Sequence, residues 1–196
     1  MRERKANIIR KTKETRIKVM LNIDGKGLFD IETGIDFLNH MLEVFTRHGL
    51  FDLKLKAESL DNDQHHLVED IGITLGDAFK KALGDMKGIT RAGYFVMPMD
   101  ESLAILAIDI CGRPYLRFDA EFKEKFVGNL KTELVQEFFQ GFVNNLQASL
   151  HIRLSYGRTD HHKIEAIFKG FGKALAIACS TNPKAKETFP STKGLL

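Results

Sequence analysis

Apolar and polar positions repeat with two periods along this chain, and each period occurs in both halves. Residues 51–59 and 149–157 alternate with a period of two, which is typical of half-buried strands. After each, the apolar positions follow a period near 3.6, which indicates an amphipathic helix. Helical patterns also precede these strands, at 37–48 and 134–146, and strand-like patterns lie further upstream, at 14–27 and 101–114.

The repetition predicts two similar halves of about three strands, a helix, a strand and a helix. We divide the chain into a first half (1–88), a second half (89–180) and a C-terminal tail (181–196), all within one compact domain. Gly25 and Gly112 fall at matching positions, where we expect hairpin turns between paired strands. The predicted fold is α+β, with the helices packed between two mostly antiparallel sheets.

Composition and charge exclude several classes of protein. The chain has 196 residues, 43% of them hydrophobic and 28% charged, as in ordinary globular proteins. A formal charge of +3 suits an anionic substrate but does not indicate a nucleic-acid partner without a clustered basic face. Cys111 and Cys179 lie too far apart to suggest a disulfide framework or a thiolate metal site. With no long apolar run and no signal-peptide pattern, we expect a cytoplasmic protein without a membrane partner.

The pattern HHxxE occurs twice, at residues 65–69 and 161–165, each time at the start of a predicted helix. Adjacent residues on a helix point about 100° apart, whereas residues three or four apart share a face. Each glutamate can therefore meet an ion with either histidine, but the two histidines of a pair cannot easily share one. The pattern predicts two metal ions, and imidazole with carboxylate suits Mn, Fe, Co, Ni or Zn.

Other histidines and carboxylates fit this site less directly. His40 lies one helix upstream and is a further candidate ligand, and Glu137 occupies the matching position in the second half. His48 precedes Gly49, so a role at the C-terminal end of its helix is an alternative to substrate binding. His151 lies in a predicted strand, and we interpret it as a core histidine.

The chain also offers cations suited to an anionic group. Arginine grips phosphate in a bidentate fork, and lysine acts as a point charge. The candidates are Arg91, Arg113, Lys169 and, in the tail, Ser191 with Lys193. Each of them alone could equally be an ordinary surface residue.

The segments "TGIDFLNHML", "DNDQHHLVEDIGITLGDAF", "PMDESLA", "DICGRPYL" and "HHKIEAIFKGFGKAL" resemble the imidazoleglycerol-phosphate dehydratase family of histidine biosynthesis. The resemblance extends over nearly the whole chain. It implies a duplicated fold similar to the second domain of ribosomal protein S5, two Mn²⁺ ions per active site, and a homo-oligomer of 24 subunits with sites shared between subunits. It also implies a hydro-lyase that converts D-erythro-imidazoleglycerol phosphate, a small-molecule phosphate, to imidazole acetol phosphate.

The resemblance also assigns roles to individual residues. The implied metal ligands are His40, His65, His66, Glu69, His161, His162 and Glu165, with Glu137 as a further ligand because some members have histidine there. The implied substrate contacts are Glu14, His40, His48, Arg91, Arg113, Lys169, Ser191 and Lys193. Glu14 and Glu165 are the candidate catalytic carboxylates.

Two metal ions suit the chemistry because an imidazole ring has two nitrogens that point apart. We hypothesise that an imidazolate bridging both ions expels the neighbouring hydroxyl. The residues by themselves leave a binuclear metallohydrolase open, as well as a metal-storage shell and, less well supported, an RNA-binding module. Only the resemblance favours dehydration over hydrolysis.

Overall fold

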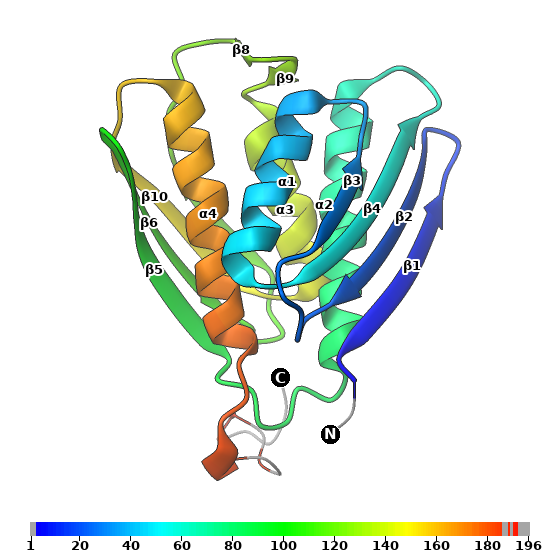
Figure 1. The fold of residues 1–196 in the computed structure, drawn as a ribbon, viewed down its shortest axis with the longest axis vertical. Coiled ribbons are helices and arrows are strands. Elements are labelled where there is room, and N and C mark those ends of the chain that lie inside the picture. The colour runs from blue at the N-terminus through cyan, green and yellow to red at the C-terminus, as the bar shows by residue number, and fades with distance from the viewer. Residues whose placement is uncertain (1–2, 186–187, 189, 192–196) are drawn as a thin grey trace.

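Four helices form a layer between two four-stranded sheets (Figure 1). This computed structural model describes residues 3–185, 188 and 190–191. The chain folds as two successive halves, each of which contributes one sheet and two helices. The first half comprises β1 (Lys5–Lys11), β2 (Thr15–Asn22), β3 (Phe29–Glu32), α1 (Asp36–Gly49), β4 (Asp52–Ser59) and α2 (Gln64–Leu83).

The second half repeats this order and inserts a short hairpin, β8–β9, before its first helix. Its elements are β5 (Ala92–Met99), β6 (Ser102–Asp109), β7 (Tyr115–Asp119), β8 (Phe126–Val127), β9 (Leu130–Lys131), α3 (Leu134–Leu146), β10 (Ser149–Tyr156) and α4 (Asp160–Cys179), followed by a short 3₁₀ turn, η1 (Pro183–Ala185). Residues 84–91 connect the halves, so the predicted boundary near 88 lies in this connector.

The two sheets share one topology. Their strand orders are β1-β2-β4-β3 and β5-β6-β10-β7, in which only the last pair of each sheet is parallel. The predicted α+β class and the duplication are therefore confirmed. The expected hairpins across Gly25 and Gly112 are wrong, because β3 and β7 lie at the far edges of their sheets. In each half a helix, α1 or α3, connects the edge strand to its parallel neighbour, because parallel strands need a crossover connection.

Alternation along the strands places one face of each sheet against the helices. In β2, Ile17, Val19 and Leu21 are buried, whereas the residues between them are exposed. The same parity holds in β10, where Leu150 and Ile152 face the core and His151 is exposed beside Tyr115. The interpretation of His151 as a core histidine is therefore wrong.

Each of the four helices contributes one phenylalanine to a central cluster. Phe45, Phe79, Phe142 and Phe171 are all at most 1% exposed. Their ring centroids lie 5.0–6.1 Å apart around the cluster, in stacked and edge-to-face arrangements. Aromatic pairs at such distances stabilise by about 0.5–1.5 kcal/mol beyond the burial of their area. The cluster therefore joins both halves at the level of the helices.

Glycines allow the helices of the two halves to approach closely. A Cβ atom added at Gly76 of α2 would lie 2.4 Å from the carbonyl oxygen of Phe142 in α3. A Cβ atom added at Gly172 of α4 would lie 2.4 Å from the carbonyl oxygen of Phe45 in α1. The two glycines are 96 residues apart, as are the two HHxxE motifs. The duplication thus extends to the helix crossings.

The β8–β9 hairpin joins the N-terminal ends of three helices. Asn129 accepts a hydrogen bond from the backbone N–H of Phe37, and its carbonyl oxygen accepts one from Gln64 Nε2 at 2.8 Å. The loop before the hairpin is held by Asp160 at the start of α4, which accepts two backbone N–H groups at 2.6 and 2.7 Å. Lys163 neutralises this buried carboxylate at 2.7 Å. The histidine-bearing ends of α2 and α4 are thereby held in one framework.

We predict that Gly76→Ala and Gly172→Ala each destabilise the fold by about 1–3 kcal/mol, because the new methyl group forces a close-packed crossing apart. Urea denaturation of the metal-free protein measures this change. Helix propensity alone would give the opposite sign, a gain of roughly 0.8–1 kcal/mol. A stabilised variant would therefore contradict the close packing of these helices.

Candidate metal centre

Both histidine pairs lie in the first turn of a capped helix. Asp63 is the N-cap of α2 and accepts a hydrogen bond from the His65 N–H at 2.8 Å. Thr159 is the N-cap of α4 and accepts one from the His162 N–H at 3.4 Å. Such caps satisfy N–H groups that the helix itself leaves unpaired. They also fix where each helix begins, and hence the direction of each histidine.

The two histidines of each pair diverge. The rings of His65 and His66 have centroids 6.1 Å apart and planes at 88°. The rings of His161 and His162 have centroids 5.8 Å apart and planes at 90°. The candidate clusters separate the two rings of the second pair, with His161 beside His40 and Glu165 and His162 beside Asp100 and Glu101, as adjacent positions on a helix favour.

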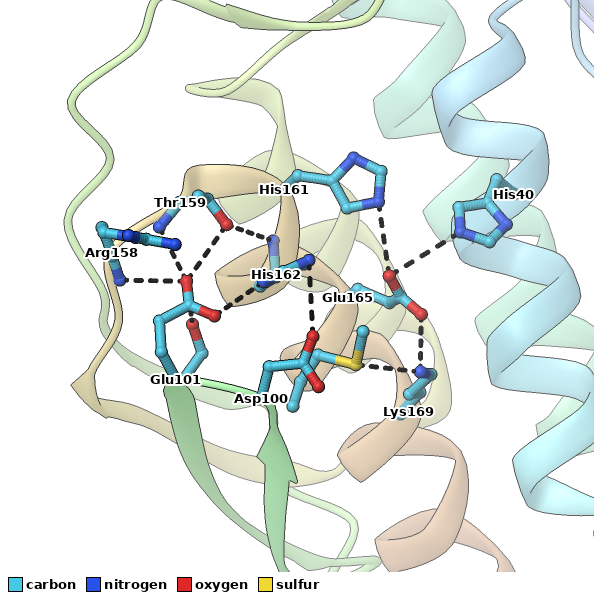
Figure 2. A network of polar contacts seen from close by, with 11 residues as sticks. His40, Asp100, Glu101, Arg158, Thr159, His161, His162, Glu165 and Lys169 are labelled. Atoms are coloured by element: carbon cyan, nitrogen blue, oxygen red, sulfur yellow. Dashed lines mark hydrogen bonds and ion pairs between the residues drawn. The ribbon is translucent and has the colours of Figure 1, made fainter.

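His161 joins a cluster that bridges two helices (Figure 2). Its Nε2 lies 3.3 Å from Glu165 Oε2, and Nε2 of His40 on α1 lies 3.8 Å from the same oxygen. The Glu165 side chain is only 8% exposed, whereas the His40 and His161 side chains are 43% and 47% exposed. These three groups could hold a metal ion, with the carboxylate at the base and two imidazoles toward solvent.

Lys169 adds a positive charge to this cluster. Its Nζ lies 2.5 Å from Glu165 Oε1 and 3.2 Å from Met99 Sδ. Burial raises the pKa of Glu165, but the hydrogen bond and charge of Lys169, with smaller electrostatic contributions from His40 and His161, outweigh it and lower the pKa. Glu165 is therefore a carboxylate whose anionic form Lys169 stabilises.

His162 belongs to a second cluster on the other side of α4 (Figure 2). Its Nδ1 lies 2.7 Å from Glu101 Oε2, while Glu101 Oε1 accepts hydrogen bonds from the backbone N–H and the hydroxyl of Thr159. The His162 hydrogen bond is the main cause of a Glu101 pKa far below its ordinary value, and Glu101 in turn raises the pKa of His162. When Nδ1–H donates to a carboxylate, the lone pair of Nε2 can bind a metal ion, the usual arrangement behind a metal-bound histidine. Nε2 of His162 lies 3.9 Å from Asp100 Oδ2.

His66 has the same arrangement in the first half. Its Nδ1 lies 2.7 Å from Asp61 Oδ2, and this hydrogen bond is the main cause of its raised pKa. Glu14 lies in the turn between β1 and β2 and is the third member of this cluster. The two halves therefore both present a histidine that is oriented by a carboxylate.

The other predicted ligands are less closely grouped. His65 is exposed, while Glu69 and Glu137 are half-buried on α2 and α3. Within the described part of the chain, no candidate metal cluster includes these three residues or combines histidines from both motifs. A single chain thus brings together parts of sites rather than one complete site.

The predicted anion-binding residues are dispersed. Nε and Nη2 of Arg91 bind the Asp109 carboxylate at 2.6 and 3.0 Å, and Nη1 donates to the carbonyl of Pro190 at 2.7 Å. Arg113 is exposed in the loop between β6 and β7, and Ser191 is half-buried in the bend after Pro190. Burial, followed by the charges of Lys169 and Lys173, lowers the pKa of His48. Lys193 lies outside the described residues.

Sequence reasoning missed two carboxylates, Asp61 and Glu101. Signals were available for both. Glu101 aligns with Glu14 when the halves are superimposed, and Asp61 lies five residues before His66, in the loop that leads into the helix. Neither position by itself shows which ring nitrogen the carboxylate meets, because Glu101 lies in the turn between β5 and β6 and Asp61 in the loop between β4 and α2, whose paths periodicity does not specify.

In the described part of the chain, no helix combines the length and apolar character needed to cross a bilayer.

The structure is a duplicated α+β fold with histidine–carboxylate clusters that could hold divalent metal ions. A family model described as imidazoleglycerol-phosphate dehydratase matches residues 33–175. The chain belongs to this family and is a dehydratase, a hydro-lyase of histidine biosynthesis that acts on a small molecule. The metallohydrolase, storage and RNA-binding alternatives do not fit this membership.

Similar proteins cover the whole chain. An imidazoleglycerol-phosphate dehydratase of Koribacter versatilis is 55% identical over 98% of this chain and 100% of its own length. One from Clostridium botulinum is 51% identical over 100% of both chains. The crystal structure of the Staphylococcus aureus enzyme covers 91% of this chain and 99% of its own, with 40% identity and a TM-score of 0.82. That of the Pyrococcus furiosus enzyme, in complex with (S)-C348, covers 96% and 100%, with 36% identity and a TM-score of 0.84.

The Glu101–His162 pair gives a defined dependence of stability on pH in the metal-free protein. Because the pKa of Glu101 is lowered in the folded state, this carboxylate stabilises the fold at pH values above its ordinary pKa of 4.5. The contribution is lost as the pH falls through the folded-state pKa. Because the pKa of His162 is raised in the folded state, this imidazole stabilises the fold at pH values below its ordinary pKa of 6.5. The contribution is lost as the pH rises through the folded-state pKa.

We therefore predict that Glu101→Gln lowers the Tm of metal-free protein most between pH 4.5 and 6.5, and less on either side. Thermal unfolding across pH 3–9, with a chelator present, measures the difference from the unmodified chain. Glu58→Gln, which alters an exposed ion pair with Arg16, is the control and should show no such maximum. A difference that does not vary with pH would contradict the assigned pair.

Proposed function

We propose that this dehydratase converts D-erythro-imidazoleglycerol phosphate to imidazole acetol phosphate with two Mn²⁺ ions per active site, as a cytoplasmic homo-oligomer. The observation that carries the proposal is the separation of the adjacent histidines of the second motif into two clusters, one with His40 and Glu165 and the other with Glu101. Two divergent imidazoles suit two ions, and two ions suit the two nitrogens of an imidazole substrate. Family membership supports the substrate.

The donor groups of this chain fit a first-row divalent metal. They are imidazole nitrogens and carboxylate oxygens without thiolates, and one cluster already gathers His40, His161 and Glu165. The carboxylates on Nδ1 of His66 and His162 orient Nε2 of both rings outward. The proposed ligands are His40, His65, His66, Glu69, Glu137, His161, His162 and Glu165.

The bound ions would supply Lewis acidity at the substrate ring, which makes loss of the neighbouring hydroxyl easier. The chain's own residues must then bind the phosphate and move protons. For the phosphate we propose Arg91, Arg113, Lys169, Ser191 and Lys193, and for further substrate contacts Glu14, His40 and His48. Lys169 forms an ion pair with Glu165, which also contacts His40 and His161, so this cation lies beside the proposed metal ligands.

Glu14 is the best placed carboxylate for proton transfer. Glu101 is fully engaged by His162 and Thr159, and Glu165 by Lys169 and two histidines. Among the described residues, the Glu14 carboxylate has no hydrogen-bond or ion-pair partner, although it lies in the cluster with His66. A carboxylate that is not committed to another group can accept and return a proton. Glu165 is the second candidate.

The incomplete clusters support sites that form between copies of this chain. His40, His161 and Glu165 come from one helix pair, whereas the cluster with His66 lies at the start of α2. Residues from a neighbouring copy could complete both sets of ligands. We propose an assembly of 24 subunits, in which each active site combines the first motif of one subunit with the second motif of another.

The proposed reaction can be tested directly with purified protein. Removing metal with a chelator should lower kcat on D-erythro-imidazoleglycerol phosphate by at least about 100-fold, and Mn²⁺ should restore it, because the ring then regains its Lewis acids. Release of imidazole acetol phosphate is the measurement. Full turnover by protein that elemental analysis shows to be free of metal would contradict the proposal.

The role of Glu14 predicts that Glu14→Gln lowers kcat by about 10²–10⁴-fold while Mn content and assembly stay unchanged. Steady-state kinetics, elemental analysis and size-exclusion chromatography measure the three quantities. Glu58→Gln is the matched control, because Glu58 is exposed on β4 and pairs only with Arg16. Normal turnover by Glu14→Gln would remove Glu14 from the mechanism.

A further inference from the structure

A buried carboxylate, Asp70, connects the turn that carries Glu14 to the helix that carries the first histidine pair. Asp70 follows Glu69 in α2, and it is 5% exposed. Its Oδ2 accepts a hydrogen bond from the hydroxyl of Thr15 at 2.5 Å, and Thr15 is 0% exposed. Its Oδ1 accepts a hydrogen bond from Nε of Arg10 at 2.9 Å, and Nη2 of the same guanidinium forms an ion pair with it at 2.8 Å.

These partners flank the turn between β1 and β2. Arg10 lies near the end of β1, and Thr15, the first residue of β2, directly follows Glu14. Within the turn, the Thr12 hydroxyl accepts the backbone N–H groups of Glu14 and Thr15 at 3.0 Å. The Glu14 carbonyl accepts the N–H of Leu60 at 2.7 Å, beyond the end of β4. The backbone of Glu14 is thus fixed on several sides, while its carboxylate has no hydrogen bond or ion pair with any residue that the structure describes.

The second half provides an internal comparison. Ala166 takes the position of Asp70 there, and Gly157 takes that of Asp61. Glu101, the counterpart of Glu14, orients His162 and binds the N-cap Thr159 with its own carboxylate. In the first half two aspartates replace this carboxylate: Asp61 orients His66, and Asp70 attaches the β1–β2 turn to α2.

We propose that Asp70 is a positioning residue, which holds the Glu14 turn at a fixed distance from His66 and Glu69 and so leaves the Glu14 carboxylate free to transfer protons. The proposal rests on the function proposed above. Charge-assisted hydrogen bonds in a buried site are short and directional, so Thr15 and Arg10 lock the geometry from both strands. Displacement of a reacting group by about 1 Å can lower a rate by about 100-fold.

The test is Thr15→Val, which removes the hydroxyl donor and keeps the size of the side chain. We expect kcat to fall by about tenfold or more, with KM and Mn content within about twofold of the unmodified protein. Thr15→Ser, which keeps the donor, should recover most of kcat. Thr74→Val is the matched control, because Thr74 is equally buried on α2 but bonds only its own helix, at the Asp70 carbonyl.

A second readout needs neither metal nor substrate. In metal-free protein, amide hydrogen exchange of residues 12–16 should be faster in Thr15→Val than in Thr15→Ser or Thr74→Val, because the turn has lost its attachment to α2. Faster exchange without turnover by the unmodified protein would reject the proposed function and keep the positioning role. Unchanged exchange and unchanged kcat in Thr15→Val would overturn the positioning role alone.

A merely structural effect has a different signature. If kcat of Thr15→Val falls no further than that of Thr74→Val at a similar Tm, or falls only in step with Mn content, the proposal is rejected. If Thr15→Val does not fold, the proposal is tested with Arg10→Gln, which removes the half-buried cation from the same cluster. A threefold or larger loss of kcat with KM kept supports the proposal, and unmodified kcat rejects it.

Discussion

Neighbouring side chains on an α-helix point about 100° apart, and the whole proposed site depends on this constraint. It is consistent with the separate neighbours of His161, beside His40 and Glu165, and of His162, beside Glu101. A pair that cannot share one ion must either serve two ions or leave one histidine idle. The carboxylates on Nδ1 of His66 and His162 indicate that neither of these second histidines is idle.

The rest of the fold positions the N-terminal ends of α2 and α4, which carry the two histidine pairs. The N-caps Asp63 and Thr159 define where the helices begin, and the β8–β9 hairpin holds those ends together through Gln64 and Asp160. The glycine crossings and the phenylalanine cluster set the distance between the helices behind them. The duplication reuses this frame, but the two halves differ in their carboxylates: Glu101 binds His162 and Thr159, whereas Glu14 is the carboxylate that we propose for proton transfer.

The sequence predicts the fold well because its signals are local and occur twice. Periodicity and the repeated HHxxE motif predict the halves, the helix starts and the divergence of the histidines. Strand pairing is long-range, so a turn glycine such as Gly25 could not show that β3 pairs with β4 rather than with β2. His151 could have been placed correctly, because it alternates with Leu150 and Ile152, whose apolar side chains must face the core. The engagement of Arg91 by Asp109 depends on the pairing of β5 with β6, which periodicity does not specify.

The central claim is that the histidines of each pair bind different metal ions. Anomalous scattering at the manganese edge, from crystals of Mn²⁺-loaded protein, tests it most directly. The account predicts two separate manganese positions at each active site, with His161 and His162 bonded to different ions, and likewise His65 and His66. A single ion bound by both histidines of one pair, or manganese bound away from both motifs, would contradict it.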